Sequence, residues 1–140
     1  MNLWWKKGWE VNFQNIHWQE GGVWCQGLYW PHPQSKTCVI LMHGSMANAH
    51  WWRAIAGYLA QDFQVFAPHF SGMGESDWRD TYSVRGHALE VKRALDVLEC
   101  DQFISVGHSY GGYCGLMLAN FAIRQHVAHV LVDSPLAPLL

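Results

Sequence analysis

The sequence predicts an α/β fold in which helices cover both faces of a mostly parallel sheet. Residues 38–42 and 103–106 are short, continuous apolar runs, which are typical of strands buried on both faces. Between such runs lie segments with helical periodicity, of which residues 84–98 are the clearest. Because a helix that joins two strands returns the chain in the same direction, this alternation indicates a parallel sheet.

The first third of the chain predicts an antiparallel hairpin at the edge of that sheet. Residues 10–18 alternate between apolar and polar side chains, and residues 23–30 form a second strand-like run. The Gly21-Gly22 pair between them supplies the tight turn that a hairpin needs. Pro31 and Pro33 then interrupt the chain before the next element.

The remaining elements are expected to alternate between strand and helix. In chain order they are a strand over 38–42, a helix over 49–60, a strand over 63–67, a helix over 84–98, a strand over 103–106, a helix over 113–121 and a strand over 129–132. The inward stripe of the first helix is expected to hold Trp52, Ile55, Ala56 and Leu59. The inward stripe of the second is expected to hold Val84, Ala88, Val91, Leu95 and Leu98.

Composition excludes several classes of function. The 140 residues, half of them apolar, are enough for a single domain with a core, which we expect to span residues 1–140. The net charge of −2 gives no electrostatic footprint for nucleic acid, so no such partner is expected. No apolar stretch approaches the roughly 20 residues of a membrane span, and the first residues lack the apolar region of a signal peptide. A cytoplasmic location is therefore expected.

The residues that often bind metals or membranes form no clear motif. The four cysteines lie far apart and the nine histidines contain no His-Glu-x-x-His pattern, so neither a metal site nor a cofactor is expected. Six of the nine tryptophans precede residue 31, and most of these are expected in the core or on half-buried strands. An exposed Trp4-Trp5-Lys6-Lys7 segment would offer a weak contact to a membrane surface or a partner.

The pentapeptide Gly107-His108-Ser109-Tyr110-Gly111 is the strongest functional motif. It lies between an expected strand and an expected helix, which is the context of a nucleophile elbow. Gly107 and Gly111 are expected because a Cβ there would collide with neighbouring backbone, and the Ser109 hydroxyl would then stand at the carboxyl end of the sheet. An ordinary strand-to-helix turn is the alternative interpretation.

A second loop is expected to meet this elbow, because the carboxyl ends of parallel strands share one edge of the sheet. Residues 42–46 follow an expected strand directly, and Gly44 lets the backbone turn there. The N–H of Ser45, or less favourably of Met46, would then form an oxyanion hole with the N–H of Tyr110.

Three motifs in this order resemble the α/β-hydrolase fold superfamily, in its serine-nucleophile branch. They are His43-Gly44-Ser45, Gly72-Met73-Gly74-Glu75-Ser76 and Gly107-His108-Ser109-Tyr110-Gly111-Gly112, and the resemblance covers residues 10 to 136. One departure is His69, where many relatives carry an aspartate. Members have eight strands, so the resemblance implies an α/β-hydrolase core truncated after about the sixth strand, that is, an N-terminal fragment.

The resemblance also implies a Ser–acid–His triad, and the chain supplies it incompletely. The histidine follows the last strand in relatives, and none of the nine histidines matches that position. Asp133 ends the sixth strand, where some relatives place the acid; a loop-capping role is its alternative. His43 resembles the structural histidine of its loop, with a role as base as the weaker alternative.

We therefore expect a serine hydrolase that attacks a small-molecule ester, thioester or related carbonyl through an acyl-enzyme at Ser109. The 140 residues alone are expected to be inactive, because serine needs a base. A non-catalytic binding or interaction module that retains the hydrolase cleft is the alternative. In either case the final strand is expected to leave an unpaired apolar edge through which chains associate.

Overall fold

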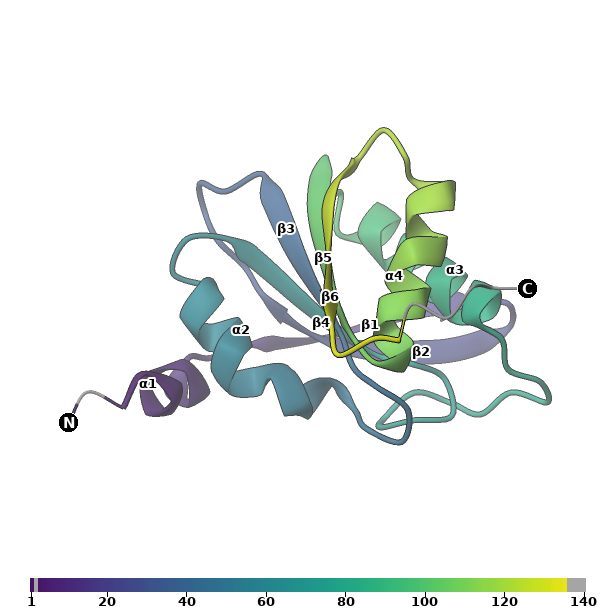
Figure 1. Cartoon of the computed structure of the whole chain (residues 1–140), viewed down its shortest axis with the longest axis horizontal. Coiled ribbons are helices and arrows are strands. Elements are labelled where there is room, and N and C mark those ends of the chain that lie inside the picture. Colours follow the sequence, from purple (N-terminus) through teal and green to yellow (C-terminus); the bar gives the residue numbers. More distant parts are fainter. Residues whose placement is uncertain (2, 136–140) are drawn as a thin grey trace.

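A six-stranded sheet runs through the protein, and helices pack on both of its faces (Figure 1). The computed structural model describes residues 1 and 3–135. In spatial order the strands are β1 (Gln14–Glu20), β2 (Val23–Trp30), β4 (Gln64–His69), β3 (Thr37–Met42), β5 (Gln102–His108) and β6 (His126–Val132). The last four are mutually parallel, whereas β1 pairs with β2 and β2 pairs with β4 in antiparallel register. The predicted fold class and the hairpin at the sheet edge are therefore confirmed.

Strand β3 shows how the sheet separates two apolar layers. Its residues Cys38, Ile40 and Met42 join the core under α3 (Val84–Val97) and α4 (Tyr110–Phe121). The alternate residues Val39 and Leu41 join the core under the 3₁₀ turn η1 (Ala49–Trp52) and helix α2 (Arg53–Leu59). All five side chains are nearly or fully buried, which explains why this strand reads as a continuous apolar run.

The helices confirm one expected stripe and correct the other. In α3, Ala88, Val91 and Leu95 are buried, and Val84 and Leu98 pack against the same core. In the η1–α2 segment, Trp52 and Ala56 are buried and Leu59 is partly buried, but Ile55 is 38% exposed. The prediction for Ile55 was wrong because the segment begins as a 3₁₀ turn, which changes the angular spacing of the residues that follow.

The amino-terminal segment departs most from expectation. Residues Trp4–Glu10 form helix α1, and strand β1 begins only at Gln14. Gly8 explains the difference, because its backbone lies against Ala54 and Gly57 of α2 so closely that a Cβ would have no room. Helix α1 thus depends on a contact with α2, and it lies almost entirely before residues 10–18, for which the alternating strand was expected.

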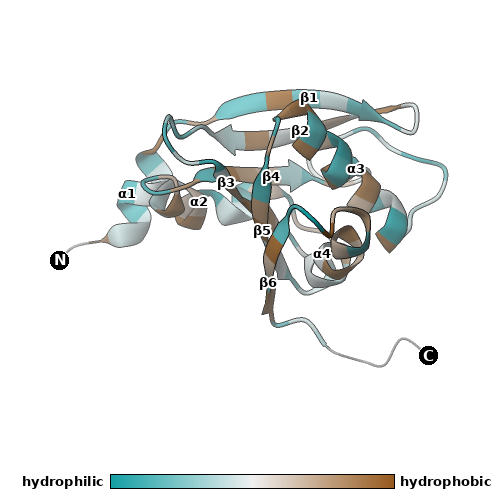
Figure 2. Cartoon of the chain, turned by 90° about the horizontal axis from the view of Figure 1, so that it is seen from above, coloured by the Kyte–Doolittle hydropathy of each residue, from teal (hydrophilic) through white to brown (hydrophobic). Residues whose placement is uncertain are grey.

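The expectation for the first six tryptophans was wrong for the three that lie on α1, whereas Trp24 lies on the half-buried strand β2. Trp18 and Trp30 are buried, whereas Trp4, Trp5, Trp9 and Trp24 are 47–51% exposed. Three of the exposed rings belong to α1, which lies on the surface beside α2 (Figures 1 and 2). In the part of the chain that the structure describes, no helix has the length and apolar character of a membrane span.

Strand β6 lies at one edge of the sheet, with only β5 as a neighbour. Val127 and Val130 on this strand are 58% and 46% exposed. That residues 1–140 form one incomplete domain stays a prediction, and residues 2 and 136–140 lie outside the described part.

We predict that the 140-residue chain self-associates through β6 at micromolar concentration, because an exposed apolar edge offers free backbone donors and acceptors. Val130→Lys should shift the chain towards the monomer in size-exclusion chromatography. Val97→Lys, at a helix position that is 50% exposed, is the matched control and should leave the elution profile unchanged. A wild-type chain that elutes as a monomer at all concentrations would refute the prediction.

Candidate active site

Ser109 occupies the tip of a sharp turn between β5 and α4. Its backbone has a φ of 50° and a ψ of −114°. A non-glycine residue held in such a conformation costs about 1–3 kcal/mol, so the surroundings must fix it. The N–H of Ser109 donates to the Val132 carbonyl at the end of β6, 3.0 Å away. The Ser109 side chain is half-buried and forms no hydrogen bond with another described residue.

Close backbone contacts explain the glycines on either side of this serine. A Cβ on Gly107 would overlap the backbone of Gly111 and Gly112. A Cβ on Gly111 would overlap the Met42 carbonyl and lie 2.6 Å from the His43 carbonyl oxygen. The turn at Ser109 therefore packs directly against the end of β3, as the elbow interpretation expects.

The loop after β3 reaches the same place. A Cβ on Gly44 would lie 2.9 Å from Nδ1 of His108, so a larger residue would force the His108 ring or the loop to shift. The backbone N–H groups of Ser45 and Tyr110 donate no hydrogen bond to any acceptor in residues 1 and 3–135. Tyr110 is the first residue of α4, where the helix dipole favours negative charge. Two free donors thus flank the turn.

His43 holds the loop after β3 to the loop after β4. Its Nδ1–H donates to the Gly44 carbonyl at 2.8 Å, and its Nε2 accepts from the Phe70 N–H at 3.2 Å. The ring is fully buried, and burial lowers its pKa to about 4. Because both nitrogens are occupied, His43 has no lone pair that could take a proton from Ser109. The geometry supports the structural interpretation of His43.

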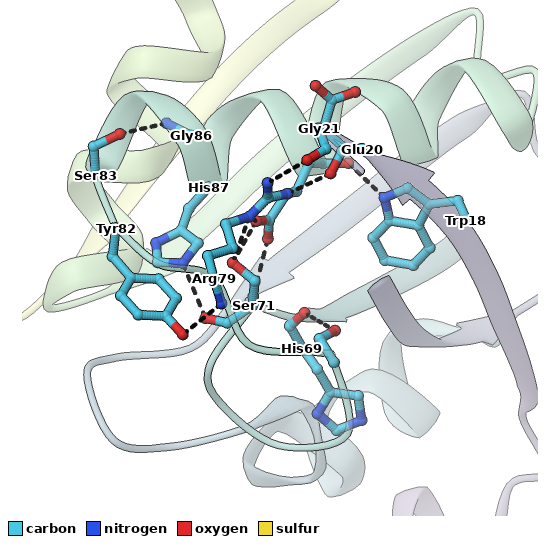
Figure 3. A network of polar contacts seen from close by, with 12 residues as sticks. Trp18, Glu20, Gly21, His69, Ser71, Arg79, Tyr82, Ser83, Gly86 and His87 are labelled. Carbon is cyan, nitrogen blue, oxygen red and sulfur yellow. Dashed lines mark hydrogen bonds and ion pairs between the residues drawn. The ribbon is translucent and has the colours of Figure 1, made fainter. Parts of the chain in front are cut away.

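A polar network reaches the residue that follows Ser109, and Figure 3 shows the part of it around Ser71, Arg79 and His87. The Tyr110 hydroxyl donates to Nδ1 of His87 at 2.7 Å, and Nε2–H of His87 donates to the Ser71 carbonyl at 3.1 Å. The Ser71 hydroxyl donates to Glu90, which also pairs with Arg79 at 2.8 Å. The network thus connects α3, the loop after β4 and the residue that follows Ser109.

Arg79 extends this network to the hairpin. Its guanidinium donates to the carbonyls of Glu20 and Gly21 in the turn between β1 and β2, at 2.6 and 3.3 Å. Sequence reasoning missed Arg79, Glu90 and His87. Glu90 could have been noticed as a charged residue next to the inward stripe of α3, but its partners lie in other elements.

Asp133 follows the last residue of β6, beside the turn that carries Ser109. It has a φ of 47°, its side chain is exposed, and its carboxylate forms no hydrogen bond among the described residues. Its neighbour Ser134 contacts the turn directly, because the Ser134 hydroxyl donates to the Ser109 carbonyl at 2.9 Å. Sequence reasoning missed Ser134, whose position depends on the loop after β6.

The other histidines close to the turn pack or form hydrogen bonds away from the Ser109 hydroxyl, and Nδ1 of His108 is buried without a hydrogen-bond partner among the described residues. His108 stacks on Trp51 with ring centroids 4.5 Å apart. His126 and His129 both lie on β6, which begins three residues earlier than expected, and both bind the buried Ser105 hydroxyl, at 2.7 and 2.6 Å. No histidine of the chain forms a hydrogen bond with the Ser109 hydroxyl in the described structure.

One group of three potential metal ligands occurs among the described residues. Donor atoms of His50, His69 and Glu75 lie within 4.8 Å of one another. However, the Ala49 N–H donates to Nδ1 of His69 at 3.2 Å, which places the proton of the neutral ring on Nε2. A ring in that state offers no lone pair to a cation, so we assign no metal to this group.

Acidification should destabilise the fold between pH 6.5 and pH 4. Burial lowers the pKa of His43 and of His69 to about 4, from 6.5. Between these values the unfolded chain binds protons that the folded chain does not. The free energy of unfolding should therefore fall, as the pH falls, by up to about 1.4 kcal/mol per pH unit for each histidine.

Urea denaturation at pH 7 and pH 5 measures this dependence. His43→Gln should flatten it, whereas His17→Gln, at an exposed position, should not. An equal free energy of unfolding at both pH values would contradict the lowered pKa of these histidines. An unchanged pH dependence of the free energy of unfolding in His43→Gln would contradict it for His43.

Known proteins of similar sequence were found for most of the chain. The family model described as alpha/beta hydrolase fold matches residues 37–140. A human serine hydrolase-like protein is 30% identical over 70% of this chain and 50% of its own length. Lipase LipV of Mycobacterium tuberculosis is 28% identical over 75% of this chain and 40% of its own length. An uncharacterized protein of Mycobacterium tuberculosis is 37% identical over 61% of this chain and 25% of its own length.

Solved structures agree with the fold described above. A 2-hydroxy-6-oxo-6-phenylhexa-2,4-dienoate hydrolase from Rhodococcus superposes with a TM-score of 0.81 and 28% identity, over 91% of this chain and 48% of that one. The thioesterase domain of the curacin biosynthetic pathway shares the fold with a TM-score of 0.82 and 24% identity, over 93% of this chain and 49% of that one. The chain thus spans between a quarter and a half of the length of these five proteins, and it belongs to the alpha/beta hydrolase fold family.

Proposed function

We propose that this chain carries the nucleophile and the oxyanion donors of a serine hydrolase, with Ser109 as the nucleophile. The observation that carries the proposal is the strained backbone of Ser109, at a φ of 50° between β5 and α4. Nothing in the packing of an ordinary turn requires a serine there, whereas a nucleophile at this position gains a half-buried hydroxyl beside a helix amino terminus that has no hydrogen-bond partner among the described residues. The free N–H groups next to it support the same proposal.

The oxyanion hole in this proposal consists of the N–H groups of Ser45 and Tyr110. Both are free in the described structure, and the glycine contacts at Gly44, Gly107 and Gly111 bring their loops together. His43 would act as a positioning residue that holds the loop of Ser45. Such preorganised donors stabilise the charge that develops on a carbonyl oxygen during attack.

We propose that the substrate is a small molecule with an ester, thioester or related carbonyl, and that Ser109 forms an acyl-enzyme with it. The names of relatives support a carbonyl substrate without selecting one, since they include a lipase and a thioesterase domain. During acylation the Ser109 oxygen bonds to the carbonyl carbon, its proton passes to a base, and the leaving group departs. Water then releases the acyl group.

Among the described residues, no side chain is placed to accept the proton of the Ser109 hydroxyl. No histidine contacts the Ser109 hydroxyl in the described structure, so we propose that the 140-residue chain is inactive by itself. Asp133 lies next to the turn and remains our candidate for the acid. Its exposed carboxylate without a described partner favours neither this role nor a loop-capping role.

Chemical rescue with imidazole tests Ser109 directly. A fluorophosphonate probe should label the wild-type chain at Ser109 when imidazole supplies the missing base, and only weakly without it. Ser109→Ala should abolish this labelling. Ser45→Ala is the matched control, because it removes a nearby exposed hydroxyl and keeps the backbone N–H. Mass spectrometry of the labelled peptide identifies the serine.

Two results of this experiment would count against the proposal. Equal labelling of wild type and Ser109→Ala would place the reactive group elsewhere. A folded wild-type chain that never reacts at Ser109, at any imidazole concentration, would favour the second candidate function, a non-catalytic binding module that retains the hydrolase cleft.

Gly44→Val tests the oxyanion hole. The valine side chain would displace the loop, since even its Cβ would lie 2.9 Å from Nδ1 of His108. Loss of the Ser45 donor should slow imidazole-assisted acylation of Ser109 by a nitrophenyl ester about 10²–10³-fold. Ala47→Val, in the same loop, should have a much smaller effect. A near-normal rate in folded Gly44→Val would mean that the second donor is not Ser45.

A further inference from the structure

Helices α1 and α2 carry exposed aromatic side chains, of which the Trp4 and Tyr58 rings lie edge to face with centroids 6.0 Å apart. Trp4, Trp5, Trp9 and Tyr58 are 49%, 49%, 47% and 52% exposed, and we refer to these four residues as the aromatic patch. Helix α1 lies at one end of the molecule beside α2, away from α3 and α4 (Figures 1 and 2). Exposed tryptophan is unusual on a soluble surface, so four large rings on one short surface call for an explanation.

The protein holds this patch in a fixed arrangement. A helix of seven residues is not stable alone, so α1 depends on its contact with α2. The Gly8–Gly57 contact brings the two helices together, and the Arg53 guanidinium lies over the rings of Trp9 and Phe13, at 4.7 and 5.1 Å. Helix α1 and the Trp9 ring are thus held in place before any ligand arrives, which lowers the entropic cost of binding.

Two lysines adjoin the patch on the same helix. Lys6 and Lys7 are exposed, and neither forms an ion pair with a carboxylate in residues 1 and 3–135. Glu10 is the single acidic residue of α1, so the helix keeps a net positive charge. A ligand for this surface should therefore combine an anionic outer layer with an apolar layer directly beneath it.

We propose that the aromatic patch and Lys6–Lys7 form a peripheral binding site for the surface of an anionic phospholipid bilayer. Tryptophan and tyrosine rings favour the bilayer interface, where an apolar ring body and a polar N–H or O–H are both satisfied. Lysine stems extend along apolar surface while their ammonium groups reach the headgroups. Lysine is depleted at protein interfaces, which makes a protein the weaker fit for this combination. The proposal is independent of the role of Ser109.

Flotation of the whole chain with lipid vesicles tests this site. The chain should float with vesicles of phosphatidylcholine and phosphatidylserine, more weakly with phosphatidylcholine alone, and less at high salt. Lys6→Gln and Lys7→Gln should each lower the affinity for the anionic vesicles about fivefold. Trp5→Ala should lower the affinity for both kinds of vesicle on the order of tenfold, because apolar area is lost.

Matched variants separate the patch from exposed tryptophan in general. Trp24→Ala and Trp78→Ala remove rings that are 51% and 80% exposed but lie outside α1 and α2, and they should bind vesicles as the wild type does. Trp5 is preferred over Trp9 as the test residue because the Trp9 ring also packs on Arg53. Circular dichroism shows whether each variant is folded.

Two outcomes would overturn the proposal. One is a folded wild-type chain that does not float with anionic vesicles. If that chain instead self-associates with increasing concentration, and Trp5→Ala abolishes the self-association, the aromatic patch binds a second copy of the chain. The other is equal loss of flotation in Trp5→Ala and Trp78→Ala, which would remove any special role for α1. Neither outcome would bear on labelling of Ser109.

Discussion

The close approach of the β5–α4 turn to the end of β3 is the contact on which the candidate site depends. Gly111 lies so near the Met42 and His43 carbonyls that no side chain fits between the two segments. This contact sets the position of Ser109 and brings the loop of Ser45 beside it. Because the backbone conformation of Ser109 is strained, packing of the neighbouring strands must stabilise it. The buried residues of β3 and the inward face of β5, with Phe103 fully buried, supply that rigidity through tight apolar packing.

Buried polar groups then fix the loops that the sheet alone would leave free. His43 joins the loops after β3 and β4, and the Arg79–Glu90 pair joins α3 to the hairpin turn. A buried ion pair pays a large desolvation cost, and here the Ser71 hydroxyl and N–H offset part of it by binding the Glu90 carboxylate. Removing one partner would leave a charge without compensation in the interior. The network therefore ties the loop after β4 to α3 and to the hairpin turn.

Sequence reasoning succeeded where the signal is local and failed where it depends on distant contacts. The apolar runs of β3 and β5 and the stripe of α3 identify the sheet and its helices, because burial on a regular element leaves a periodic pattern. Gly107 and Gly111 were recognisable because one tight turn leaves no room for a Cβ at either position, and Ser109 was recognisable from its place between them. Helix α1 was missed because the fit of Gly8 against Gly57 lies outside its own segment. Arg79, Glu90 and Ser134 were missed for the same reason, since each contacts an element far away in the chain.

The described residues also separate two kinds of chemistry. Charge stabilisation at the candidate site uses backbone N–H groups, which glycine-dependent turns can place without help from other side chains. Proton transfer needs a side chain with a free lone pair that reaches the Ser109 hydroxyl. His43, His126 and His129 use ring nitrogens in other hydrogen bonds, and the His108 ring stacks on Trp51 without a hydrogen bond to Ser109 in the described structure. Under the proposed function, Ser109 therefore sits in a site that can hold a developing negative charge but cannot yet remove the proton. Imidazole in solution supplies only a base for the Ser109 proton. The rate of Ser109 labelling in its presence therefore depends on the geometry of the turn and not on the rest of the chain.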